Sequence, residues 1–330
     1  MEKLSPIVQE AFGINSRRVK KEKGRYLCDT QGGLMYIYIT SELPESIRLQ
    51  HSIKEHLSEK GFPWTDRYQL AGTGQPYILI GREAYVMVKH PCERRETDFD
   101  NETEALQAFK FLAHFHTAAR GVTHTLPQSL SMPETYARQM SELTQAGKQA
   151  RRGSRMSDFD VSFIKHAPRF FEIMQDSVNR LASTGYAALH AQAISQSSIC
   201  HNSLKEENLP VANDATYITN FADATVDLQL ADLAALIRRY AQRSNKSIPS
   251  YRFLEVYDAI NPLPAEACDI LFSLLIFPWA FNKIITQYYS KKRNWTPGGL
   301  INRLDAILAE RDSYEKYAET INLHQYHHVK

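Results

Sequence analysis

The stretch Ile199-Cys200-His201-Asn202-Ser203-Leu204-Lys205-Glu206-Glu207-Asn208-Leu209 decides the fold of this chain. A predicted β-hairpin follows it, in which Leu209-Pro210-Val211 and Thr216-Tyr217-Ile218-Thr219 flank an Ala-Asn-Asp-Ala turn. The hairpin ends at Asn220-Phe221. A histidine and an asparagine at fixed offsets before such a hairpin are typical of a catalytic loop.

The spacing matches the catalytic loop of phosphotransferases with a protein-kinase-like fold. Those enzymes use His-x-Asp, four further residues and then Asn, and their hairpin ends in Asp-Phe or Asp-Leu. Here His201 and Asn208 keep their places. However, Ser203 stands where the catalytic Asp belongs, and Asn220 stands where the magnesium-binding Asp belongs. A serine hydroxyl stays protonated near neutral pH, and an amide oxygen binds magnesium far more weakly than a carboxylate.

Two further parts of the phosphate-binding machinery are missing from the sequence. A kinase strand carries a lysine that pairs with the α- and β-phosphates. This sequence has no lysine between Lys23 and Lys54, and its candidate strand carries Tyr36-Ile37-Tyr38-Ile39. Gly24-Arg25 and Gly32-Gly33 are predicted turns, and neither forms a G-x-G-x-x-G loop. The sequence therefore predicts a catalytically inactive protein, a pseudokinase.

The order of the predicted elements indicates two lobes. Up to residue 90 the pattern predicts a small antiparallel sheet with one helix over residues 44–60. Beyond it, the pattern predicts a mainly helical region with the embedded hairpin, including continuous helices over residues 159–189 and 264–289. We therefore expect an α+β, bilobal protein-kinase-like fold, with the N-lobe at residues 1–90 and the C-lobe at residues 91–330.

Composition excludes several other classes of protein. Lys and Arg number 39 against 37 Asp and Glu, a net charge of +2, so no overall charge draws the chain to nucleic acid or membrane. Its four cysteines are too far apart for a metal site or a dense disulfide framework, which predicts free thiols in a reducing compartment. The N-terminus has no apolar signal region, and the longest apolar run, Ile270 to Ile276, is too short to span a membrane. We expect a cytosolic protein that is not secreted.

The chain resembles the bacterial spore-coat-associated proteins of the CotS type, relatives of aminoglycoside phosphotransferases and choline kinases. The resemblance covers most of the chain and rests on an ordered set of motifs: Tyr85-Val86-Met87, Glu93-Arg94-Arg95-Glu96-Thr97-Asp98-Phe99, Leu112-Ala113-His114-Phe115-His116-Thr117-Ala118, Cys200 to Asn208, Val226-Asp227-Leu228, Asp232-Leu233-Ala234 and Ile276-Phe277-Pro278-Trp279. Relatives that keep the pattern have Cys-His-x-Asp in the loop and Ile-Asp-Phe-Asp or Ile-Asp-Leu-Asp after the hairpin. This sequence departs at Ser203 and at Thr219-Asn220-Phe221-Ala222. Asp227 and Asp232 match scaffold positions of the family, and Asp232 is also a candidate N-cap.

The resemblance implies a catalytically inactive, structural or scaffolding component of the spore coat that binds other coat proteins and uses no cofactor. It places the finished protein in the coat after synthesis in the cytoplasm. The alternative is an atypical small-molecule kinase or nucleotide-binding switch that binds ATP and Mg²⁺ through Asn208 and a relocated acid, Asp223. The sequence also leaves open a small-molecule ligand in the cleft between the lobes.

Overall fold

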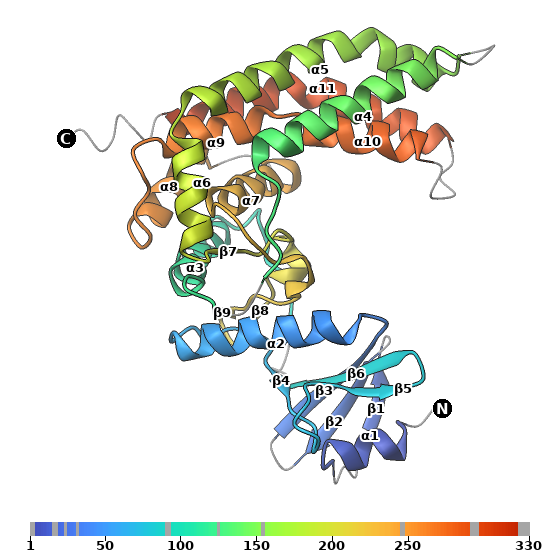
Figure 1. Ribbon diagram of the computed structural model, residues 1–330, viewed down its shortest axis with the longest axis vertical. Helices are drawn as coiled ribbons and strands as arrows, with labels where there is room; N and C mark the ends of the chain where they lie inside the picture. Colours follow the sequence, from blue (N-terminus) through green and yellow to red (C-terminus); the bar gives the residue numbers. More distant parts are fainter. Residues whose placement is uncertain are drawn as a thin grey trace. The chain divides into compact units, whose positions relative to one another are not determined.

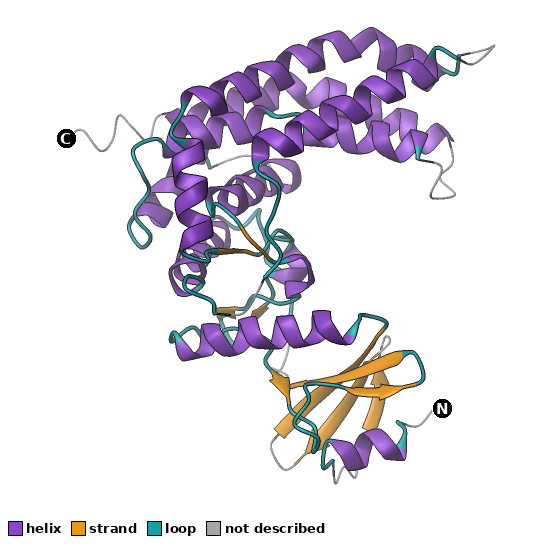
Figure 2. Cartoon of the chain, viewed as in Figure 1, coloured by secondary structure: helices purple, strands orange, loops and turns teal. Residues whose placement is uncertain are grey.

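The structure, a computed structural model, divides the chain into two units (Figures 1 and 2). It describes residues 4–14, 19–22, 25–30, 33–89, 94–123, 126–152, 156–244, 248–290 and 297–322. The first unit contains Met1–Pro127 and Gln196–Val226, and the second contains Gln128–Ser195 and Asp227–Lys330. The lobe boundary predicted near residue 90 stays a prediction. It rests on the change in sequence pattern along the chain, whereas the two units are defined by contacts between residues.

The first unit is built on an antiparallel sheet with the strand order β1-β2-β3-β6-β4, in which β5 also pairs with β6. The strands are β1 (Val19–Glu22), β2 (Arg25–Thr30), β3 (Gly33–Thr40), β4 (Tyr68–Gln69), β5 (Ile78–Ile80) and β6 (Glu83–Lys89). In the central pair, Tyr36 lies opposite Val88 and Tyr38 lies opposite Val86. The antiparallel sheet predicted for this region is therefore present. The prediction of one helix is wrong, because a second helix, α1 (Pro6–Ala11), precedes the sheet and is too short to show a hydrophobic period.

Two helices use the two faces of this sheet, because successive side chains of a strand point to opposite sides. Helix α1 (Pro6–Ala11) buries Val8 in a cluster with Ile37 of β3. Helix α2 (Pro44–Glu59) buries Ile47 against Val86, and the partly buried Tyr38 packs on that second cluster. The face that carries Tyr38 is thus the one covered by α2.

The rest of the first unit is α3 and the segment predicted to resemble a catalytic loop. Its elements are α3 (Glu102–Ala118), β7 (Ile199–Cys200), η1 (Glu206–Asn208), β8 (Val211–Ala212), β9 (Ala215–Thr216), η2 (Phe221–Asp223) and β10 (Thr225–Val226). Phe115 of α3 packs against Phe62 and Phe221. Its ring centroid lies 5.9 Å from that of Phe62 and 6.0 Å from that of Phe221. This aromatic contact fixes the end of the β8–β9 hairpin on α3.

The second unit is helical. It contains α4 (Met132–Ala150), α5 (Asp158–Ser183), α6 (Tyr186–Ser195), α7 (Leu230–Arg243), α8 (Ser250–Asp258), α9 (Ala267–Ile276), α10 (Trp279–Tyr289), α11 (Pro297–Glu319) and η3 (Thr320–Asn322). Stacked aromatic rings hold the helices together. The ring centroids of Tyr136 and Phe277 are 3.6 Å apart, and those of Phe170 and Phe281 are 3.7 Å apart.

Two helices predicted as continuous are interrupted, so those predictions are wrong. Residues 159–189 are divided between α5 and α6, because Thr184 is extended (φ −93°, ψ 172°) and the chain at Gly185 passes close to Glu266. Residues 264–289 are divided between α9 and α10 at Phe277, which precedes Pro278. A proline removes a backbone donor and disfavours helical geometry in the residue before it.

One apolar segment of the described ranges, Ala267–Tyr289, has the length and composition of a membrane span, with a mean hydropathy of 1.5 over 18 residues. However, 67% of that window is buried inside the protein, and the segment is broken between α9 and α10. Burial by neighbouring helices gives a core helix pair the same apolar composition. We therefore assign the segment to the core of the helical unit.

Candidate functional site

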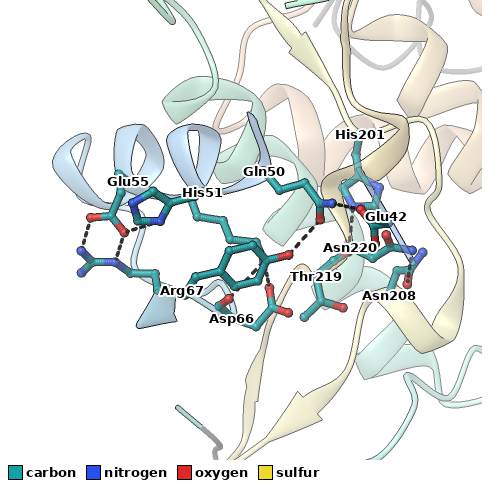
Figure 3. Close-up of polar contacts among 12 residues, drawn as sticks. Glu42, Gln50, His51, Glu55, Asp66, Arg67, His201, Asn208, Thr219 and Asn220 are labelled. Carbon is teal, nitrogen blue, oxygen red and sulfur yellow. Dashed lines mark hydrogen bonds and ion pairs between the residues drawn. The ribbon is translucent and has the colours of Figure 1, made fainter. Parts of the chain in front are cut away.

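His201 joins the loop after β7 to the end of the hairpin (Figure 3). Its side chain is fully buried, and its Nε2 lies 2.9 Å from the carbonyl oxygen of Thr219. Its Nδ1 accepts a hydrogen bond from the backbone N–H of Ser203 at 3.3 Å. A ring nitrogen that accepts leaves the other to donate, so His201 is a neutral imidazole that holds two segments together.

Ser203 and Asn208 are tied to each other inside the loop. The Asn208 Nδ2 donates to the backbone oxygen of Ser203 at 2.8 Å and contacts its hydroxyl at 3.3 Å. Both side chains are buried. In the described part of the chain, the side chain that contacts the Ser203 hydroxyl is the neutral amide of Asn208, and no carboxylate does so.

Asn220 occupies a left-handed backbone position, with φ 64° and ψ 73°. Asparagine adopts this conformation more readily than most residues. Its Nδ2 points to the Asn208 Oδ1 at 3.5 Å, the outer limit of a hydrogen bond (Figure 3). Two neutral amides therefore face each other where a kinase-like enzyme has an amide, a metal ion and a carboxylate.

These residues do not fit a magnesium ion. Mg²⁺ prefers carboxylate, phosphate and water oxygens in octahedral geometry. Here the Asn208 oxygen is directed at an amide N–H, and Asn220 brings no charge. The described ranges contain no group of three His, Cys, Asp or Glu side chains that could hold a metal ion.

Asp223, the acid proposed for a relocated metal site, is exposed at the end of η2. Its backbone oxygen accepts a hydrogen bond from the Asn202 Nδ2 at 3.1 Å, and the same amide donates to Thr225 at 2.7 Å. Asn202 thus fixes the main chain of this turn. The structure brings together His201, Ser203, Asn208 and Asn220, and it shows no contact between them and the Asp223 carboxylate within the described residues.

The two scaffold aspartates belong to the helical unit. Asp227 is buried, its Oδ1 accepts the Leu228 N–H at 2.6 Å, and it lies 3.5 Å from His190. Burial raises the pKa of the Asp227 carboxyl, although the Leu228 N–H and His190 oppose the increase. The N-cap prediction for Asp232 is wrong, because α7 begins at Leu230 and its N-cap is Gln229. Asp232 lies in the first turn, where the helix dipole still favours a carboxylate.

Lys54, which the sequence analysis did not select, is a fully buried cation in the first unit. Its Nζ lies 2.8 Å from the Asp66 Oδ1 and 3.1 Å from the Asp66 backbone oxygen. It also lies 3.7 Å from the ring centroid of Tyr68 and 5.9 Å from that of Phe221. Burial lowers the pKa of the Lys54 ammonium, Asp66 opposes the decrease, and the charge of Arg94 adds to it.

The sequence does contain a signal for Lys54. It lies seven residues after Ile47, four after Gln50 and three before Leu57, all of which are buried on one face of α2. Residues at these spacings share a helix face. The same face carries Gln50, whose Nε2 donates to Glu42 and whose Oε1 accepts from the Tyr68 hydroxyl at 3.1 Å (Figure 3).

The strand that carries the phosphate-pairing lysine in kinases corresponds to β3, which carries tyrosines here, as the sequence shows. Tyr36 and Tyr38 lie on β3, and the Arg25 guanidinium of β2 lies 4.0 Å from the Tyr36 ring centroid. Arg25 also donates to the Tyr38 hydroxyl at 3.4 Å. The cation on this face of the sheet is therefore stacked on an aromatic ring.

Arg94 is a second cation that the sequence analysis did not select. It is half-buried, and its Nη2 donates to the Thr219 hydroxyl at 3.1 Å. Thr219 directly precedes Asn220 in the sequence. The motif Glu93 to Phe99 contains Arg94, but only the fold shows that this side chain reaches the end of the hairpin; Glu93 lies outside the described residues.

The order of elements and the loop from His201 to Asn208 define a protein with a bilobal α+β, kinase-like fold. A solved aminoglycoside phosphotransferase from Alicyclobacillus acidocaldarius subsp. acidocaldarius DSM 446 matches with a TM-score of 0.84, covering 100% of this chain and 98% of that chain. The two are 16% identical, so the likeness shows the fold alone. It confirms the predicted fold class.

The chain belongs to the family described as "Spore coat putative kinase YutH", which matches residues 5–321. It is 20% identical to the endospore coat-associated protein YutH of Bacillus subtilis (strain 168), over 95% of this chain and 91% of that protein. It is 21% identical to spore coat protein S of the same organism, over 94% of this chain and 91% of that protein. The predicted resemblance to the CotS type is thereby confirmed.

Proposed function

We propose that this protein is a catalytically inactive, kinase-fold structural component of the bacterial spore coat that binds other coat proteins and uses no cofactor. The observation that carries the proposal is the neutral character of Ser203, Asn208 and Asn220. Phosphoryl transfer needs a base for the acceptor hydroxyl and carboxylate ligands for magnesium. The spore coat names of both relatives support the location.

The test of inactivity is a phosphoryl-transfer assay with labelled ATP, magnesium and a panel of aminoglycoside, choline and protein acceptors. We expect the wild-type chain to transfer no more label than a protein-free control. An active aminoglycoside phosphotransferase is the positive control. Magnesium-dependent transfer by the wild type that disappears in Asn208→Ala would overturn the proposal.

The scaffolding role is tested in spores of a host from which the gene has been deleted. We expect the deletion to remove specific proteins from the extracted coat, and Asn220→Gly, which keeps the left-handed backbone position and removes the exposed amide, to restore them as the wild type does. A scaffold needs its fold and its surface, and not the amide pair. A deletion strain with an unchanged coat protein composition would contradict the role.

The buried, anchored Asn208 favours one other candidate, an atypical kinase or nucleotide-binding switch. In that alternative Asn208 and Asp223 would bind ATP and Mg²⁺. A ligand that binds the native state raises the melting temperature through mass action. This alternative requires a magnesium-dependent increase with ATP that is lost in both Asp223→Ala and Asn208→Ala.

A further inference from the structure

Arg94 places a positive charge beside the position where kinase-like enzymes hold magnesium. Its hydrogen-bond partner in the described part of the chain is the Thr219 hydroxyl, and no carboxylate there pairs with it. A guanidinium has five N–H donors and cannot be deprotonated in proteins. A half-buried arginine with one hydroxyl partner therefore has donors left for a ligand.

Thr219 is a rigid support for this arginine. Its backbone N–H donates to the Asn208 carbonyl oxygen at 3.0 Å, and its own carbonyl oxygen lies 2.9 Å from the His201 Nε2. Its side chain is buried. The guanidinium is therefore bonded to the hydroxyl of a residue whose main chain is fixed on both sides, which favours a preorganised binding geometry.

The neighbouring groups present donors where an active enzyme presents acceptors. The Thr219 oxygen accepts from Arg94, so its own proton is available to an acceptor. Asn220 is exposed and contributes an amide N–H. The charge of Arg94 also contributes to the lowered pKa of Lys54, so the two cations lie within electrostatic range. Asp66 pairs with Lys54 at 2.8 Å, and Glu42 also opposes the effect of Arg94 on the Lys54 pKa, so the positive charge that can attract an oxyanion here is that of Arg94.

We propose that Arg94, Thr219 and Asn220, hereafter the Arg94 cluster, bind the phosphate group of a ligand without a divalent metal ion. The guanidinium supplies the positive charge that magnesium supplies in an active phosphotransferase, and its planar fork matches two phosphate oxygens. The inference rests on the proposed loss of the metal site. It adds a ligand class, phosphate-bearing molecules, to a protein that transfers no phosphate.

The first test is isothermal titration of the full chain in EDTA with inorganic phosphate, pyrophosphate and ADP, repeated with excess magnesium. We expect at least one of these anions to bind in EDTA, with an affinity that magnesium does not increase. Arg94→Gln should weaken that binding about tenfold or more, the usual effect of losing a hydrogen bond to a charged group. Arg95→Gln is the matched control, because the neighbouring Arg95 is exposed and paired with Glu104 at 2.7 Å.

The second test is Asn220→Asp, which keeps the side-chain shape and replaces an amide donor with a carboxylate. We expect anion binding in EDTA to be lost and to return when magnesium is added. Three results would overturn the proposal: no anion binds the wild type, binding to the wild type requires magnesium, or Arg94→Gln and Arg95→Gln weaken it equally. All three results concern anion binding and say nothing about phosphoryl transfer. The proposed catalytic inactivity is therefore judged separately, by the transfer assay.

Discussion

Lys54 shows how a single residue in this site responds to its surroundings. Taking an ammonium out of water is costly, and a partner that keeps some exposure recovers only part of that cost. The Asp66 side chain is 19% exposed, whereas that of Lys54 is 0% exposed. The net effect of burial is a Lys54 pKa below its usual value of 10.5.

This shift predicts a pH-dependent difference in stability between the wild type and Lys54→Met. Between the lowered pKa and 10.5, the unfolded state keeps a proton that the folded state releases. The free energy of unfolding of the wild type should therefore rise, relative to Lys54→Met, as the pH increases toward 10.5. Urea denaturation of both proteins from neutral pH to pH 10.5 measures the difference.

The control for this experiment is Lys60→Met, which removes an exposed ammonium at the C-cap of the same helix. The titration of all other groups cancels in each comparison. A difference between wild type and Lys54→Met that stays constant with pH would show that burial does not lower the Lys54 pKa.

The positions of the Arg94 and Lys54 side chains near the hairpin could not be predicted from the sequence. Spacing located His201, Ser203, Asn208 and Asn220, because a catalytic loop is a local pattern. Lys54 and Arg94 reach the same region from distant segments, and no local spacing relates them to the hairpin.

At the scale of elements, the β8–β9 hairpin sets the geometry that precedes Asn220. Its two turn residues, Asn213 and Asp214, have φ angles of 49° and 56°. Positive φ at both positions is the type I′ turn, which matches the twist of a two-residue hairpin and favours Asn-Gly.

This turn predicts opposite effects for two substitutions. Asp214→Gly removes the steric cost of the left-handed conformation, and we expect a higher melting temperature. Asp214→Val introduces a β-branched residue, and we expect a loss of about 1–2 kcal/mol. Thermal and urea unfolding measure both, and a Val variant as stable as the Gly variant would contradict the assigned turn.

The N-terminus of α5 gives a second prediction at this scale. Ser157 accepts from the Asp160 N–H at 3.1 Å, and Asp160 reaches back to the Ser157 N–H at 2.9 Å, a capping box. Ser157→Ala should cost about 1 kcal/mol of unfolding free energy. Ser183→Ala, at the other end of α5, is the control, since the partner of its hydroxyl among the described residues is the Arg180 carbonyl oxygen.

Helix and strand types were largely predictable, but hydrophobic periodicity did not show where two of the helices end. Hydrophobic periodicity predicts α2 because one face of it is buried. Aromatic and β-branched residues predict β3, in which the consecutive residues Met35, Tyr36 and Ile37 are all buried. Hydrophobic periodicity continues across Gly185 and Phe277, since the residues on both sides of each break are also apolar. The break at Phe277 had a signal in the sequence, Pro278, whereas the close approach of Glu266 to Gly185 is visible only in the fold.

At the scale of the whole molecule, the division into two units predicts which parts unfold together. The cysteines Cys28, Cys200 and Cys268 are buried thiols that form no disulfide bond, as the sequence predicts; Cys92 lies outside the described residues. Burial also raises the pKa of the Cys28 thiol to about 11. Because the thiolate is the reactive form, native Cys28 should be alkylated very slowly.

Alkylation in increasing urea, read by mass spectrometry, therefore reports each unit. Cys28 and Cys200 both belong to the first unit although they are distant in sequence, so we expect them to become reactive at the same urea concentration. Cys268 reports the helical unit. If Cys28 reacts at a lower concentration than Cys200, residues 1–90 unfold separately, and the boundary suggested by composition describes the cooperative unit better.

The discontinuous first unit also has a consequence for synthesis on the ribosome. The residues of its sheet and of α3 have all emerged once Pro127 has emerged. However, the ring contact of Phe115 with Phe221 and the hydrogen bond of Arg94 to Thr219 cannot form until the second segment of the unit has been synthesised. At about 5–20 residues per second, the intervening stretch delays those contacts by roughly 5–20 s. Ribosome-arrested chains that end before Gln196 should therefore remain sensitive to protease within residues 1–127 and become protected once Val226 has emerged. Throughout that interval the nascent N-terminal segment exposes apolar surface that is a natural target for chaperones.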